Sequence, residues 1–170
     1  MNGVVMLLTL LAAAVLQHTV PGAPLFAQAK LPLVLGVVLY YALNRTPALM
    51  LAAAAAGGLL GDSLEALPVG VSAAVLILLG LAAWSGRDHV FRARLLTHAV
   101  FGLLGGAGLA LGVGGLLMAG HESLRGQAWP GLLLKAAGTG LGGLVTAPLV
   151  FAVLDRFDRW TGNVAGGTSP

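Results

Sequence analysis

Six apolar runs dominate this sequence, and most of its few charges lie between the runs or at their ends. A helix needs about 20 predominantly apolar residues to cross the hydrocarbon core of a bilayer. Only 9% of the residues are charged, which is too little to cover a water-facing surface, because soluble domains carry about 25%. We therefore predict an all-α integral membrane protein with about six transmembrane helices, at residues 3–20, 31–43, 47–61, 67–83, 95–119 and 132–154.

The runs fill nearly the whole chain, which predicts one polytopic membrane domain over residues 1–160 and a short flexible tail over 161–170. The nine Lys and Arg residues lie between apolar runs, where membrane topology explains them, so nucleic acid is not an expected partner. No basic residue precedes Lys30, so the first run lacks the start of a signal peptide and we expect a retained span. The absence of cysteine excludes disulfides and thiolate chemistry.

The second and third runs are short, with 13 and 15 residues. At 1.5 Å per residue they reach only about 20 and 23 Å. Either both runs cross the membrane with help from their flanks, or together they form a re-entrant hairpin. The hairpin would place Arg45 near the bilayer midplane, which costs at least about 2.5 kcal/mol for an unpaired charge. We therefore favour two crossings joined by a tight turn.

The basic residues also predict an orientation, because cytoplasmic loops are enriched in Lys and Arg. Three of them, Lys30, Arg125 and Lys135, fall on one side of the predicted topology. Six fall on the other side: Arg45, the basic loop of Arg87, Arg92 and Arg94, and the C-terminal Arg156 and Arg159. This bias predicts that both chain termini are cytoplasmic. It places the acids Asp62 and Glu65 on the outer side, at the turn between the third and fourth runs.

Asp62 and Glu65 are the main candidates for chemistry. They are three residues apart and share a face if that segment is helical. They could serve as catalytic acids, or they could mark the end of a helix, with Asp62 accepting backbone N–H bonds from the next helix start. No His or acid pair has metal-ligand spacing inside a run, and the glycine-rich runs lack the Lys-Ser/Thr of a phosphate loop. We expect no enzyme, no cofactor and no metal site.

Glycine is abundant, and several glycines are spaced four residues apart. Such spacing lets membrane helices approach closely, either within one chain or against a partner protein. The predicted packing pairs are Gly57/Gly61, Gly102/Gly106, Gly108/Gly112 and Gly138/Gly142.

The segment LPLVLGVVLYYALNRTPALMLAAAAAGGLLGDSLEALPVGV resembles the first half of the rod shape-determining protein MreD family. The resemblance covers about residues 31–94, with the basic loop included. Glu65 and Ala66 depart from the family pattern, which has small residues there. The matching positions are Pro32, Leu39 to Leu43, Arg45, Gly58, Leu59, Leu60, Asp62, Pro68 and Gly70.

The resemblance implies a six-span protein of the bacterial inner membrane that acts in cell elongation and peptidoglycan synthesis. MreD-like proteins are regarded as scaffold or regulatory subunits. Their partner is the single-span MreC protein, and they work beside MreB, RodA and an elongation-specific penicillin-binding transpeptidase. The resemblance also implies that Asp62, Pro68 and Gly70 shape the junction between the third and fourth helices and contact a partner on the outer side.

Two other functions stay open at this stage. The first is a substrate-binding membrane subunit of a vitamin transporter, an S-component, which also has about six spans and should show polar and aromatic residues converging on a cavity, whereas this chain has only ten aromatic residues. The second is an intramembrane enzyme that uses Asp62 and Glu65 as its acids.

Overall fold

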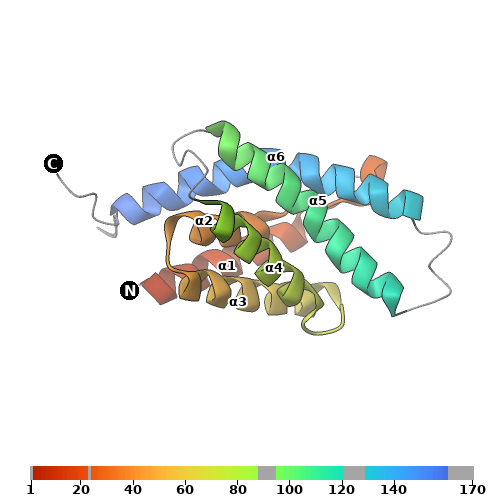
Figure 1. Ribbon diagram of the computed structural model, residues 1–170, viewed down its shortest axis with the longest axis horizontal. Coiled ribbons are helices and arrows are strands. Elements are labelled where there is room, and N and C mark those ends of the chain that lie inside the picture. Colours follow the sequence, from red (N-terminus) through yellow and green to blue (C-terminus); the bar gives the residue numbers. More distant parts are fainter. Residues whose placement is uncertain (1, 23, 88–94, 121–128, 161–170) are drawn as a thin grey trace.

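A computed structural model describes residues 2–22, 24–87, 95–120 and 129–160 of the chain. Its described part is all-α, with six helices and one short 3₁₀ turn, η1 (Pro24–Phe26). The helices are α1 (Asn2–Thr19), α2 (Leu33–Asn44), α3 (Pro47–Glu65), α4 (Val71–Gly86), α5 (Leu95–Ala119) and α6 (Trp129–Trp160). They form an elongated bundle in which α6 runs along the long axis (Figure 1).

Three of these helices, α3, α5 and α6, are long and apolar enough to cross a membrane, and α1, α2 and α4 are shorter apolar helices. The predicted run at 95–119 coincides with α5, and five predicted runs differ from their helices at the ends. The expectation that the third run is short is wrong, because α3 has 19 residues and continues through Asp62 to Glu65. The two acids lie inside the helix, since it ends only where Ala66 adopts a left-handed conformation.

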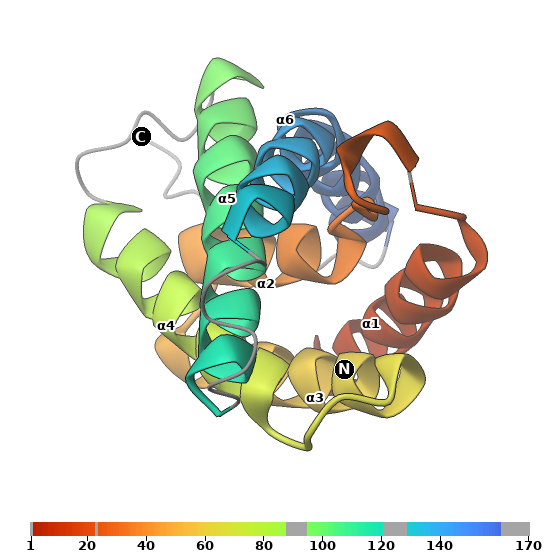
Figure 2. The ribbon, with the colours of Figure 1, turned by 90° about the vertical axis from the view of Figure 1, so that its right-hand side faces the viewer.

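Helix α2 is the centre of the bundle. Its sequence, LVLGVVLYYALN, is apolar on every side, which is typical of a fully buried helix. Every residue from Val34 to Leu43 is buried, and α2 contacts each of the other five helices. Viewed along the bundle, those helices surround α2 (Figure 2).

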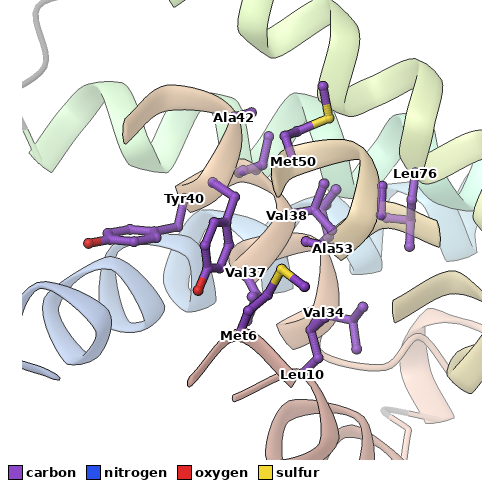
Figure 3. Packing of buried hydrophobic residues seen from close by; sticks show 14 of the residues in the cluster. Met6, Leu10, Val34, Val37, Val38, Tyr40, Ala42, Met50, Ala53 and Leu76 are labelled. Atoms are coloured by element: carbon purple, nitrogen blue, oxygen red, sulfur yellow. The ribbon is translucent and has the colours of Figure 1, made fainter. Parts of the chain in front are cut away.

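The hydrophobic core forms where α1, α3, α4 and α6 meet α2. Met6 and Leu10 of α1 pack from one side, and Met50 and Ala53 of α3 pack from another (Figure 3). Phe151 of α6 adds its ring, which meets Tyr40 edge-on with centroids 5.3 Å apart. The core thus joins helices from both halves of the chain.

The bundle has two distinct ends. We call the end that contains Lys30, Glu65 and Lys135 the Lys30 end, and the end that contains Tyr40, Arg45 and Asp158 the Arg45 end. The start of α1 and the finish of α6 both lie toward the Arg45 end (Figure 1). Figure 2 is a view onto the Lys30 end.

Candidate functional site

The α3–α4 junction at the Lys30 end is organised by the buried side chain of Asp62. Its Oδ2 accepts the N–H of Gly70 at 2.7 Å, and its Oδ1 accepts the N–H of Ser72 at 3.0 Å. Both carboxylate oxygens therefore hold the start of α4, where the helix dipole also favours a negative charge. Asp62 is thus a cap donated by the preceding helix, as the capping interpretation of the sequence expected.

The junction also depends on backbone conformation. The carbonyl of Asp62 accepts the N–H groups of Ala66 and Leu67, which closes the end of α3. Gly70 has φ +99°, a left-handed conformation that strains residues with a side chain. Pro68 accepts the N–H of Val71 at 3.3 Å through its carbonyl. Asp62, Pro68 and Gly70 therefore build one hydrogen-bonded turn.

This turn presents an apolar surface to its surroundings. Val69 at its centre is 79% exposed, and Leu64 and Pro68 beside it are also exposed. We call Leu64, Pro68 and Val69 the apolar tip. The buried carboxylate of Asp62 fixes the backbone next to the tip through its hydrogen bonds to Gly70 and Ser72. One tight loop therefore combines a hydrogen-bonded backbone with an exposed apolar surface.

Glu65, the second acid, forms an ion pair that the sequence reasoning missed. Lys30 Nζ donates to Glu65 Oε1 at 3.1 Å, and both side chains are about one third exposed. The pair joins the segment before α2 to the end of α3. Opposite charges 35 residues apart gave no local signal that they would meet.

A pocket of about 520 Å³ lies beside this ion pair at the Lys30 end. Its lining comes from α1, the segment before α2, the end of α3, α5 and α6. Polar side chains from separate segments converge there, namely those of Gln17, His18, Gln28, Lys30, Glu65, Lys135 and Thr139. The converging polar side chains fit the transporter alternative, but none of these lining residues is a Phe, Tyr or Trp, which that alternative also expects.

The Arg45 end is held by a different cluster of side chains. Asp158 near the end of α6 accepts hydrogen bonds at Oδ2 from the Tyr40 hydroxyl and from Arg45 Nη2, the latter at 2.6 Å. Phe151 lies between Tyr40 and His98, and its ring stacks on His98 with centroids 4.0 Å apart. Asp158 is not among the predicted site residues, and its partners lie more than 100 residues away, where no local pattern could indicate them.

The predicted packing glycines have different surroundings. A Cβ added at Gly102 would lie 2.1 Å from the Gly143 carbonyl oxygen, and one at Gly106 would lie 2.5 Å from the Thr139 carbonyl oxygen. These positions bring α5 and α6 into backbone contact. Cβ atoms at Gly108 and Gly112 would meet Leu79 and Val75 of α4 at 3.0 and 2.7 Å.

The other two predicted glycine pairs differ in what their glycines contact. Cβ atoms added at Gly138 and Gly142 would meet the segment before α2, at Phe26 and at Leu31 and Pro32. A Cβ at Gly57 would meet Val34 and Leu10, whereas one at Gly61 would have nothing within 4 Å. The close approach between α3 and α4 occurs at Gly58, whose added Cβ would be 2.2 Å from the Ala73 Cα.

In the predicted basic loop, Arg87 ends α4 with its guanidinium 4.9 Å from the centre of the Trp84 ring. Arg92, Arg94 and Arg125 lie outside the described residues. Within the described ranges, no group of three or more His, Cys, Asp or Glu residues is placed to hold a metal ion.

The fold and composition define the class of this protein: it is a multi-pass helical membrane protein. No protein-family model, curated protein sequence or solved structure matches the chain.

Proposed function

We propose that this protein is a scaffold or regulatory subunit of the bacterial cell-elongation machinery, with an MreC-like single-span protein as its partner. The proposal places it in the inner membrane beside MreB, RodA and an elongation-specific transpeptidase. It starts from the resemblance of residues 31–94 to the MreD family. Further support comes from two of the matching residues, Asp62 and Gly70, which form the turn between α3 and α4.

The proposed topology has six crossings with both termini in the cytoplasm. Gly138 of α6 lies beside Phe26 and Ala29, and Asp158 of α6 lies beside Arg45. These two points are 20 residues apart on α6, or about 30 Å at 1.5 Å per residue. That length matches the hydrocarbon core. Residues 26–45 run alongside this ~30 Å length of α6. The geometry therefore favours a full crossing by α2 together with its preceding segment, and it disfavours a re-entrant hairpin.

In this topology the Lys30 end is the outer end. The apolar tip, Leu64, Pro68 and Val69, then faces the outer side of the membrane. The observation that carries the proposal is that Asp62 and Gly70, two residues of the family-like pattern, form the turn that presents this tip. A hydrophobic surface on a pre-organised turn suits protein recognition, since little conformational entropy is lost when a partner binds.

Site-specific cross-linking tests this proposal. The chain contains no cysteine, so Val69→Cys introduces a unique thiol at the tip. The matched control is Leu25→Cys, which is 84% exposed and lies on η1 before Lys30. In native membranes we expect a thiol-directed cross-linker to join an MreC-like protein to Val69→Cys and not to Leu25→Cys. Recovery of no morphogenesis protein, by cross-linking or by copurification of the unmodified chain, would reject the scaffold role.

A second candidate function is the substrate-binding subunit of a vitamin-type transporter. The pocket at the Lys30 end favours it, because side chains from separate segments converge there on one cavity. This function requires that deleting the gene abolishes uptake of a particular vitamin. Unchanged uptake of labelled vitamins in the deletion strain would exclude it.

A further inference from the structure

The pocket at the Lys30 end exists because α2 is short. With 12 residues, α2 spans about 18 Å, whereas the 25 residues of α5 and the 32 of α6 span about 38 and 48 Å. Helix α2 starts at Leu33, and Pro32 before it lines the pocket. Helices α1, α3, α5 and α6 surround α2 (Figure 2), and residues of all four line this pocket.

The pocket borders the start of α2. The start of a helix carries a partial positive charge from its free N–H groups. Gln17 Oε1 accepts one of these, the N–H of Val34, at 3.2 Å. The amide of Gln17 thus fixes α1 against the start of α2 and forms part of the lining.

The lining combines charged, polar and apolar side chains. Leu132, Lys135 and Thr139 are spaced three and four residues apart, so they form one stripe along α6. Helix α5, which packs directly against α6, contributes the apolar side chains of Leu109 and Val113. Two lysines and one glutamate line the pocket, so its net charge at neutral pH is positive.

Two groups on the α6 stripe are free to bind a ligand. Lys30 is already paired with Glu65, whereas Lys135 forms no ion pair within the described part of the chain. Thr139 lies one helical turn deeper and is only 7% exposed. Among the described residues its hydroxyl has no hydrogen-bond partner, and it is not one of the fully enclosed polar atoms, so it is accessible from the pocket.

We propose that this pocket binds a small amphipathic anion, with a carboxylate or phosphate group near Lys135 and Thr139 and an apolar chain against Leu109, Val113 and Leu132. The pocket volume of about 520 Å³ is typical of sites for small molecules. Binding would supply Lys135 with a counter-ion and Thr139 with an acceptor. The inference does not depend on the scaffold role, and it specifies the class of ligand for the second candidate function.

The same chemistry occurs in an anionic lipid headgroup and in a soluble organic anion, so binding is first measured with a soluble probe in a neutral lipid. The full-length protein in phosphatidylcholine nanodiscs is titrated with octanoate by isothermal calorimetry. Octanamide serves as the neutral analogue, and empty nanodiscs correct for partitioning. We expect saturable binding of octanoate at one site per chain and no saturable binding of octanamide.

Variants locate the binding site. We expect Lys135→Gln to weaken octanoate binding about tenfold, because it removes a charge-assisted hydrogen bond. Thr139→Val removes only a hydroxyl, so we expect a smaller loss of about threefold to fivefold. Arg156→Gln is the matched control, since it removes an exposed charge from the same helix at the Arg45 end. Unchanged melting temperatures would show that the variants keep their fold.

The source of the ligand follows from repeating the titration in phosphatidylglycerol nanodiscs. Weaker octanoate binding there supports the proposal with a lipid headgroup as the natural occupant, and unchanged binding supports it with a soluble anion. Three outcomes would overturn the proposal: no saturable heat above that of empty nanodiscs, equal binding of octanamide, or equal binding by Lys135→Gln. None of these bears on the cross-link from Val69→Cys, so the two proposals fail separately.

Discussion

The two ends of the bundle each hold an acid of low exposure, and they hold it in different ways. At the Lys30 end, Asp62 is bound by backbone N–H groups 8 and 10 residues away. At the Arg45 end, Asp158 is bound by side chains 118 and 113 residues away, those of Tyr40 and Arg45. The first acid shapes a local turn, whereas the second ties the end of α6 to α2 and its following turn.

This difference leaves the two ends with different surfaces. The local cap on Asp62 completes the α3–α4 hairpin without using any neighbour, so the Lys30 end keeps an exposed tip and a pocket. The cluster around Asp158 joins α2 to α6 and fills the space between them with aromatic rings.

Two close glycine contacts hold the helices of the bundle together, and filling either one should give the largest loss of stability. Gly58→Ala places a Cβ 2.2 Å from the Ala73 backbone, and Gly102→Ala places one 2.1 Å from the Gly143 carbonyl oxygen. Backbone atoms cannot move aside as flexible side chains do, so we expect a destabilisation of about 3 kcal/mol for each. The melting temperature in nanodiscs and the yield from the membrane measure it.

Matched controls lie on the same helices. Cβ atoms at Gly61 in α3 and Gly115 in α5 would meet nothing within 4 Å. We expect Gly61→Ala and Gly115→Ala to keep or slightly raise the melting temperature, because Ala is a better helix former than Gly. If Gly58→Ala has the same melting temperature as Gly61→Ala, α3 and α4 do not approach each other closely at Gly58.

The next effect separates the two acids. Asp62→Ala leaves the N–H groups of Gly70 and Ser72 without their acceptor, at a cost of about 1–3 kcal/mol for an unsatisfied buried donor. Asp62→Asn keeps one acceptor oxygen, so we expect an intermediate loss. Because the damage is local, hydrogen exchange should increase at the start of α4 and remain unchanged in α6. An equal increase in exchange rate in α4 and α6 would mean that Asp62 stabilises the whole bundle and not only the local turn.

The Asp158 cluster should couple residues that are distant in sequence. The side chains of Arg45 and Asp158 are 13% and 19% exposed, so losing the pair should cost more than the ~1 kcal/mol of a surface pair and less than the ~3–5 kcal/mol of a buried one. In a double-mutant cycle, we expect Arg45→Gln and Asp158→Asn together to lower the melting temperature by less than the sum of the single changes. Strict additivity would contradict the pairing.

The smallest effect belongs to the ion pair at the Lys30 end. Lys30 and Glu65 are 32% and 34% exposed, and such pairs contribute about 0–1 kcal/mol. We therefore expect Glu65→Gln to change the melting temperature by only a degree or two, with less effect still at high salt. A loss as large as that of Asp62→Ala would reverse the ranking of the two acids.

Much of the local structure was predictable from the sequence. Hydropathy alone located the helices, and α5 begins and ends where the apolar run does. The cap on Asp62 was also open to prediction, because an acid close to a following helix start has few other partners in so short a loop. The end of α3 was not predicted correctly. The predicted run stops at residue 61 and leaves Glu65 beyond the helix, whereas the final turn of α3 includes Glu65.

The sequence by itself therefore determined the class of the protein, the positions of its helices and the turn around Asp62, since these depend on composition and on neighbours along the chain. The tertiary structure alone decided that α2 lies at the centre, that Lys135 and Thr139 line a pocket, and that Asp158 binds Tyr40 and Arg45. The physical reason is that lipid is as apolar as a protein core. Apolar helix faces therefore do not reveal which of them meets another helix, and only the assembled bundle brings distant polar groups together.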